Sequence, residues 1–196
     1  MTASRLLYAS PVDFKRTQFS RRVLLPPSQD YLWQIEVGVV RTLSVLEEGT
    51  TVTLGLWGAG DVVGQVLSKS AVYQMECITP VEVTRLPLER SHLVTEVLIR
   101  HIHQCQEFLE ILHSRSVDIS LLRLLNWLAK KFGSEVNQGQ LIDLRLTHQE
   151  LSEILGTTRV TVTRILNDFE KQGIIERLSR QRLVLHEQQP IWHYEI

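Results

Sequence analysis

The stretch from residue 147 to residue 173 constrains the fold of this chain more than any other part of its sequence. Thr147 is followed three positions later by Glu150, which is the capping-box spacing that begins an α-helix at His148. Gly156 can adopt the backbone conformation at which two helices meet at a steep angle. The sequence therefore predicts a first short helix that ends at this glycine.

A second helix is predicted to follow at once. Thr157 or Thr158 can cap its amino terminus, and Gly173 marks its end. Two helices joined by a glycine turn form a helix-turn-helix. The apolar residues of the second helix repeat at the i, i+3, i+4, i+7 spacing of a buried face, and they are Val162, Ile165, Leu166 and Phe169.

The polar side of the second helix predicts contact with DNA, because its amino-terminal turns are the part that enters a major groove. Arginine can donate two parallel hydrogen bonds to guanine, and threonine can contact phosphate or a thymine methyl. An ordinary solvated helix face is the alternative, and an exposed Val160 counts against it. The residues expected to contact DNA are Thr147, His148, Thr158, Arg159, Val160, Thr161, Thr163, Arg164, Asn167 and Arg180.

A short hairpin is predicted after Gly173, with strands around Ile174–Arg177 and Arg182–His186 and a turn at 179–181. Such a hairpin is the wing of a winged helix. The net charge of the whole chain is −1, but residues 157–186 carry six basic and three acidic side chains, which gives this segment a charge of +3. A protein that touches DNA with one face needs no wider basic character.

The first ninety residues predict an antiparallel β-roll of the jelly-roll kind. Six of the ten glycines lie between residues 38 and 64, as a rolled sheet with tight corners requires. Metal enzymes built on similar sheets place histidines on the strands, whereas the first histidine here is His92, so that site is excluded. The predicted strands include Val23–Leu25, Tyr31–Val40, Thr51–Trp57 and Val81–Leu86.

A single long helix without glycine or proline is predicted from Ser91 to Arg115. Its apolar residues keep near-heptad spacing on one face, as a two-stranded dimer seam would need. Packing on the chain's own β-roll is the alternative, and both can hold on different faces. The residues expected at the seam are Leu98, His101, Ile102, Cys105, Phe108, Leu109 and Leu112.

His101 and Cys105 lie four residues apart on this helix, so a two-fold dimer could bring together two histidines and two cysteines, a ligand set for zinc. An inter-subunit disulfide is a second possibility for the cysteine. We favour simple packing of the cysteine as a small apolar residue and assign no metal site.

The chain is therefore expected to be an α+β protein of three parts. Residues 1–90 form a β-roll sensor domain, residues 91–117 the long helix and a hinge, and residues 118–196 a winged helix-turn-helix. A helix from Ile119 to Phe132 and a small hairpin between Val136 and Leu146 complete the third part.

This order of parts resembles the Crp/Fnr family of bacterial transcription regulators. The run GVVRTLSVLEEGTTVTLGLWGAGDVVG at 38–64 looks like that family's β-roll, and GTTRVTVTRIL at 156–166 is similar to the recognition helix of the cyanobacterial global nitrogen regulators. The resemblance implies a homodimer on a palindromic DNA site. It also implies that Arg159, Val160 and Arg164 read bases while Thr158 and Thr161 lie near phosphate.

The effector is not identified by the resemblance, which would place it at the junction of β-roll and long helix. Cyclic-nucleotide binders carry Gly-Glu-Leu followed by Arg-Ser, whereas here Gly64 precedes Gln65 and Ala71-Val72 stands at the Arg-Ser position. Without that arginine we do not expect cAMP or cGMP to bind. An iron-sulfur cluster needs four cysteines, and the chain has two.

No nucleophile–base pair or phosphate-binding glycine loop indicates an enzyme. Two cysteines, no leader segment and no long apolar run predict a cytoplasmic protein without a membrane span. A small-molecule or redox sensor with mainly protein–protein output is the alternative function. The aromatic tail at 191–196 is expected to dock on its own domain, with RNA polymerase as the other candidate partner.

Overall fold

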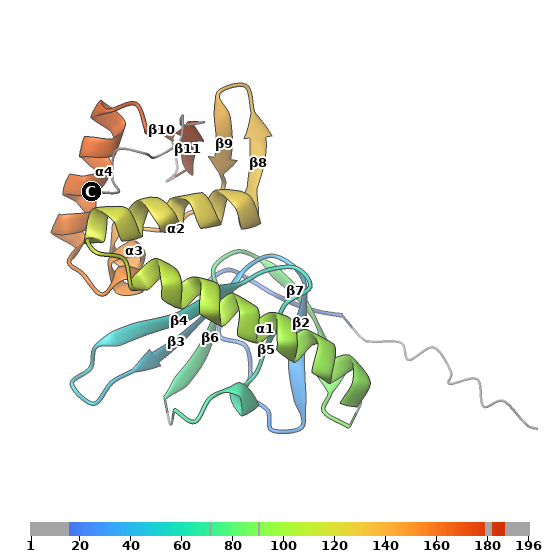
Figure 1. Ribbon diagram of the computed structural model, residues 1–196. Coiled ribbons are helices and arrows are strands. Elements are labelled where there is room, and N and C mark those ends of the chain that lie inside the picture. The colour runs from blue at the N-terminus through green and yellow to red at the C-terminus, as the bar shows by residue number, and fades with distance from the viewer. Residues whose placement is uncertain (1–15, 71, 90, 179–181, 187–196) are drawn as a thin grey trace, which may run out of the picture.

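The computed structural model describes residues 16–70, 72–89, 91–178 and 182–186. A β-roll forms one end of the molecule, a long helix runs along it, and a helical domain with a small sheet forms the other end (Figure 1). The α+β fold class is therefore confirmed. Three predicted features, namely Ala71, Arg180 and the 191–196 tail, lie outside the described residues.

The β-roll consists of two antiparallel sheets, with strand orders β1-β7-β2-β5 and β4-β3-β6. Trp33, Ile35, Trp57 and Met75 fill its interior and are almost fully buried. The elements of this part are β1 (Thr17–Phe19), β2 (Tyr31–Val37), β3 (Val40–Val45), β4 (Thr51–Trp57), β5 (Val62–Val63), the 3-10 turn η1 (Gln65–Leu67), β6 (Tyr73–Cys77) and β7 (Val81–Pro87).

Two strand predictions need correction. The run at 31–40 is two strands, because the chain turns at Gly38 with a φ of 91°. A Cβ there would lie 2.2 Å from the Pro80 carbonyl oxygen, so only glycine fits. The run at 23–25 forms a single bridge between Leu24 and Glu76 rather than a strand.

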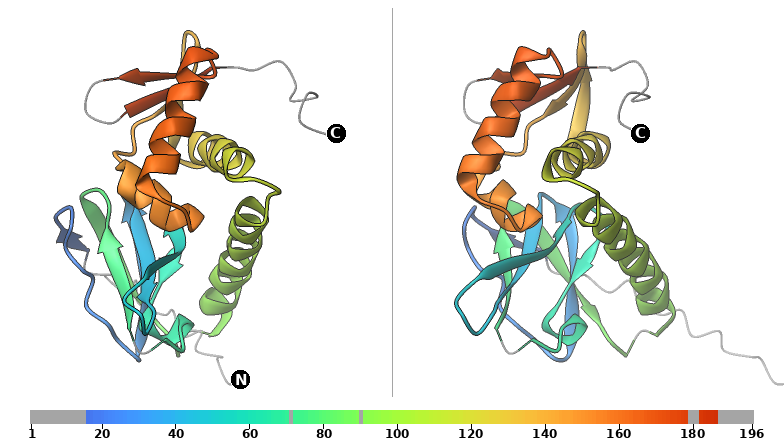
Figure 2. Two further views of the ribbon diagram at one scale, coloured as in Figure 1. Left: turned by 90° about the vertical axis from the view of Figure 1, so that its left-hand side faces the viewer. Right: turned by 60° about the vertical axis from the view of Figure 1, so that its left-hand side comes forward.

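Helix α1 (Ser91–Leu112) runs along the β-roll and ends three residues before the predicted Arg115. One face of α1 packs against the chain's own core through Val97, Phe108 and Ile111, all of which are buried. The opposite face of the helix is uncovered, as the two views in Figure 2 show. No helix among the described residues is both long and apolar enough to cross a bilayer.

The remaining elements form the predicted winged helix. Helix α2 (Val117–Phe132) ends at Gly133, where a Cβ would lie 2.2 Å from the Ala129 carbonyl oxygen. The small sheet has the order β10-β11-β9-β8. Its strands and the two other helices are β8 (Gly133–Val136), β9 (Gly139–Ile142), α3 (His148–Leu155), α4 (Arg159–Lys171), β10 (Ile175–Leu178) and β11 (Arg182–His186).

A single apolar cluster joins the β-roll to the helices. Val39, Leu56 and Ile78 of the β-roll belong to the same buried cluster as Phe108 of α1 and the inner faces of α2, α3 and α4. The division at residues 90 and 117 stays a prediction, because this cluster spans both boundaries.

Candidate DNA-binding site

The first helix of the helix-turn-helix begins as the sequence predicts. The Thr147 hydroxyl accepts a hydrogen bond from the Glu150 amide at 3.1 Å, and the Glu150 carboxylate accepts one from the Thr147 amide at 2.6 Å. Gly156 ends α3 in the left-handed conformation, with φ 61° and ψ 37°. The capping box and the glycine turn are both confirmed.

The second helix, α4, is capped by Thr158, whose hydroxyl accepts a hydrogen bond from the Thr161 amide at 3.1 Å. The predicted stripe of Val162, Ile165, Leu166 and Phe169 is buried. Burial of this stripe fixes which side of α4 faces solvent.

A hydrogen bond between side chains joins the two helices. The Thr163 hydroxyl donates to the Arg159 carbonyl at 2.8 Å, so it accepts from the His148 Nδ1, also 2.8 Å away. Burial, and then the charges of Arg177 and Arg159, lower the pKa of His148, which favours the neutral ring. His148 therefore supports the helix pair.

The solvent side of α4 presents two arginines and an apolar side chain. Val160 is 78% exposed, and the Arg164 side chain is 67% exposed. Arg164 lies 3.5 Å from Asp168, one helical turn away, and an exposed pair of this kind is held weakly. A shallow hollow of about 460 Å³ runs along this face, lined by Arg159, Val160, Thr163, Arg164, Asn167, Asp168 and Lys171.

Asn167 is engaged by the wing. Arg177 on β10 donates to the Asn167 side-chain oxygen at 2.7 Å and, through Nε, to the Glu170 carboxylate at 3.0 Å. The hydrogen bond from Arg177 lowers the pKa of Glu170. Arg177 was not among the predicted site residues, because a strand arginine that anchors a neighbouring helix leaves no local pattern in the sequence.

The predicted seam residues of α1 fall into three groups. Ile102 and Leu109 are 55% and 53% exposed on the uncovered face, while Leu98, Cys105 and Leu112 are half-buried beside it. Phe108 is only 3% exposed and packs on Trp127 of α2. His101 is also turned toward its own β-roll, so Phe108 and His101 are removed from the expected seam.

The surroundings of His101 do not fit a zinc site between subunits. Its ring stacks on Trp57, with ring centroids 3.9 Å apart, and Nδ1 lies 3.2 Å from the Val62 carbonyl oxygen. Burial lowers the pKa of His101 and raises that of Cys105. Within the described part of the chain, no three histidine, cysteine or acidic side chains are grouped to hold a metal.

Comparison with known proteins identifies the family to which this chain belongs. Residues 121–189 match the family described as the Crp-like helix-turn-helix domain. The regulatory protein CysR of Synechococcus elongatus is 39% identical over 174 residues, which are 86% of this chain and 83% of that protein. The chain belongs to the Crp/Fnr family of transcription regulators.

A second relative supports the assignment, and a solved structure has the same fold. The global nitrogen regulator of a Synechocystis species is 31% identical over 166 residues, covering 76% of this Crp/Fnr chain and 73% of that protein. A regulator of the CRP family from Thermus thermophilus has the same fold, with a TM-score of 0.74 at 24% identity over 87% of this chain and 92% of that one. These relatives are regulators and not enzymes.

Proposed function

We propose that this chain works as a homodimer that reads a palindromic DNA site with one α4 helix per subunit. The observation that carries the proposal is the face of α4, where an uncovered Val160 lies between Arg159 and Arg164. A valine that is 78% exposed has no role in the core of its own chain. Contact of this side chain with a thymine methyl would be favourable, because it removes apolar surface from water.

A second copy on the uncovered face of α1 is the partner that the proposal requires. Ile99, Ile102, Gln106 and Leu109 recur at spacings of three and four residues along that face, which is the pattern of a two-stranded coiled coil. The three apolar members are each at least 50% exposed. Gln106 is a polar position in such a seam, of the kind that favours one register over others.

The proposed reading of DNA follows from the chemistry of three side chains. Arg159 and Arg164 can each donate a fork of hydrogen bonds to O6 and N7 of guanine, while Val160 packs on a thymine methyl. Thr158 and Thr161 lie at the amino terminus of α4, which favours a phosphate. Each half-site is therefore expected to hold a guanine next to a T·A pair, with half-site centres roughly 34 Å apart.

Selection of bound sequences from random duplexes tests the proposal directly. The expected result is a two-fold symmetric consensus with a G·C pair and a T·A pair in each half. Affinity for the selected duplex should fall steeply as salt rises, because each phosphate contact releases counterions. A selection that returns no consensus, with no duplex affinity to titrate, would support the alternative of a sensor with protein–protein output.

Control by an effector at the junction of β-roll and α1 is part of the proposal, without a named ligand. This junction holds the stack of His101 on Trp57 and a hydrogen bond of 2.6 Å from Gln104 to the Leu56 carbonyl. An effector bound there would have to displace or use these contacts. Calorimetry with cAMP tests the expectation that cyclic nucleotides do not bind, and micromolar affinity would overturn it.

A further inference from the structure

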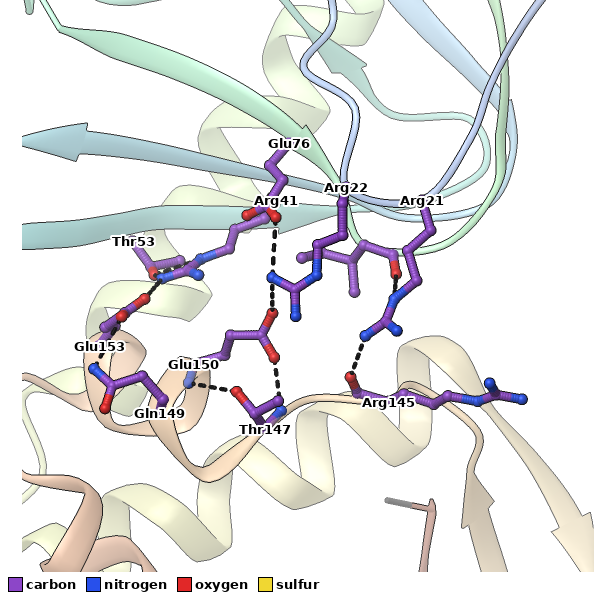
Figure 3. A network of polar contacts seen from close by, with 11 residues as sticks. Arg21, Arg22, Arg41, Thr53, Glu76, Arg145, Thr147, Gln149, Glu150 and Glu153 are labelled. Atoms are coloured by element: carbon purple, nitrogen blue, oxygen red, sulfur yellow. Dashed lines mark hydrogen bonds and ion pairs between the residues drawn. The ribbon is translucent and has the colours of Figure 1, made fainter. Parts of the chain in front are cut away.

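Three arginines of the β-roll face the first helix of the helix-turn-helix (Figure 3). Arg41 lies on β3, whereas Arg21 and Arg22 lie in the connection between β1 and β2. Arg41 pairs with Glu153 and Arg22 with Glu150, both on α3. Arg21 donates a hydrogen bond to the carbonyl oxygen of Arg145, which precedes that helix. The β-roll therefore contacts the DNA-reading unit through charged groups in addition to the shared apolar cluster.

Arg41 makes the most buried of these contacts. Its side chain is 3% exposed, and its Nη2 lies 2.7 Å from a carboxylate oxygen of Glu153. Thr53 on β4 holds the guanidinium from the other side, accepting a hydrogen bond from Nε at 2.9 Å. Apolar residues often replace a buried ion pair without loss of stability. Such a pair therefore determines where α3 lies on the β-roll more than it adds to the free energy of unfolding.

Arg22 makes the second contact from a backbone conformation that side chains rarely adopt. Its φ is 71°, and it is the one non-glycine residue with a positive φ in the described ranges. From this turn its Nη1 reaches Glu76 of the β-roll at 3.1 Å and Glu150 of α3 at 3.0 Å. The buried Glu150 carboxylate, which completes the capping box of α3, is thus also an ion-pair partner of the β-roll.

Beyond Glu153, α3 makes no ion pair or side-chain hydrogen bond to the β-roll among the described residues. A hollow of about 650 Å³ separates residues 49–53 of the β3–β4 hairpin from the end of α3 and the turn to Thr157. The charged contacts between α3 and the β-roll are therefore those of Glu150, near the start of the helix, and Glu153, two residues before its end.

We infer that Arg41 and Arg22 are positioning residues for DNA recognition. They fix α3, and through it α4, at one place on the β-roll, and so set the separation of the two α4 helices in a dimer. This inference rests on the proposed function, because it concerns how the reading helix is placed. Loss of either contact is expected to loosen the separation while leaving the chemistry of the α4 face unchanged.

The test uses the full chain and duplexes that carry two copies of the selected half-site. The distance between the half-sites is varied by single base pairs, and a duplex with one half-site measures reading alone. The variants are Arg22→Ala and Glu153→Gln. Arg16→Ala and Glu82→Gln are the matched controls, because that pair, 3.7 Å apart, joins two residues of the β-roll.

The parent protein and the controls should prefer one spacing strongly. In Arg22→Ala and Glu153→Gln the ratio of affinities between the best and the next spacing should fall by about fivefold or more. Affinity for the single half-site should stay within about twofold. Loss of folding stability alone would lower all affinities together and would not change this ratio.

An unchanged ratio in both variants would overturn the inference while the proposed function stands. If the parent protein binds none of these duplexes, the proposed function fails, and this inference fails with it. Arg22→Ala keeps the test decisive if Glu153→Gln does not fold, because the Arg22 side chain is 49% exposed, and its removal leaves the Arg41 pair and the hydrogen bond from the Thr147 amide to the Glu150 carboxylate in place.

Discussion

The imidazole of His101 lies flat against the indole of Trp57, with ring centroids 3.9 Å apart and an angle of 6° between the ring planes. The contact joins α1 to β4 within one chain. It gives the histidine a role in packing the long helix onto the β-roll. His101 therefore points away from the uncovered face of α1.

This stack predicts a dependence of stability on pH. Burial lowers the pKa of His101 in the folded protein, so the unfolded chain binds more protons between that value and about 6.5. The free energy of unfolding should therefore fall as the pH drops below about 6.5. Urea unfolding of His101→Phe should show a weaker pH dependence than the parent. Part of the pH dependence will remain in this variant, because burial also lowers the pKa of His148. His103→Gln, on the exposed side of α1, is the control.

The uncovered face of α1 predicts which substitution separates the subunits. Ile102→Glu places a charge in the proposed seam and should give monomers in sedimentation experiments, with a change in subunit stability within about 0.5 kcal/mol. Phe108→Ala, in contrast, should lower the free energy of unfolding by about 3–5 kcal/mol, because Phe108 is buried in its own chain. A dimer of unchanged strength in Ile102→Glu would place the seam elsewhere.

The face of α4 predicts a change of base preference. Val160→Glu should shift selection from T·A toward C·G at one step of each half-site, because glutamate accepts a hydrogen bond from cytosine. Arg164→Ala should cost about 1–3 kcal/mol per half-site and relax the choice of base, whereas Arg180→Ala should weaken all sequences alike. The same consensus from Val160→Glu and the parent would show that Val160 does not face the groove.

The cap of α4 predicts a loss of stability that is separate from DNA reading. Thr158→Ala removes the acceptor for the Thr161 amide and should lower the free energy of unfolding by about 1 kcal/mol. The neighbouring Thr157→Ala is the control, because Thr158 provides the cap. Equal urea midpoints for the two variants would argue against this cap.

The helix-turn-helix could be predicted closely because its signals are local. Thr147, Glu150, Gly156 and Thr158 act on neighbours within a few residues, and each does in the structure what its position indicates. The face of α1 that packs on the core was harder to predict, because the helix has two apolar stripes. One includes Val97, Phe108 and Ile111 and meets the core, and the other is exposed. Spacing along one helix does not say which stripe a distant sheet will cover.

The arginine contacts were outside the reach of sequence reasoning. Arg41 and Glu153 are 112 residues apart, and a single arginine on a strand looks like an exposed residue until its neighbours are known. Arg22 gave no signal either, since nothing in its neighbourhood in the sequence requires a left-handed turn at that residue.

The apolar cluster that runs from Val39, Leu56 and Ile78 into the helices limits how this protein can be rebuilt. A chimera that transplants residues 118–196 onto a foreign sensor would lack these three side chains, and the inner faces of α2 and α3 would lose the apolar surface on which they pack. The recipient sensor would need apolar side chains of matching shape at the same three positions. The smallest DNA-binding unit that can be transferred is therefore the helical domain together with the part of the β-roll that carries these three residues.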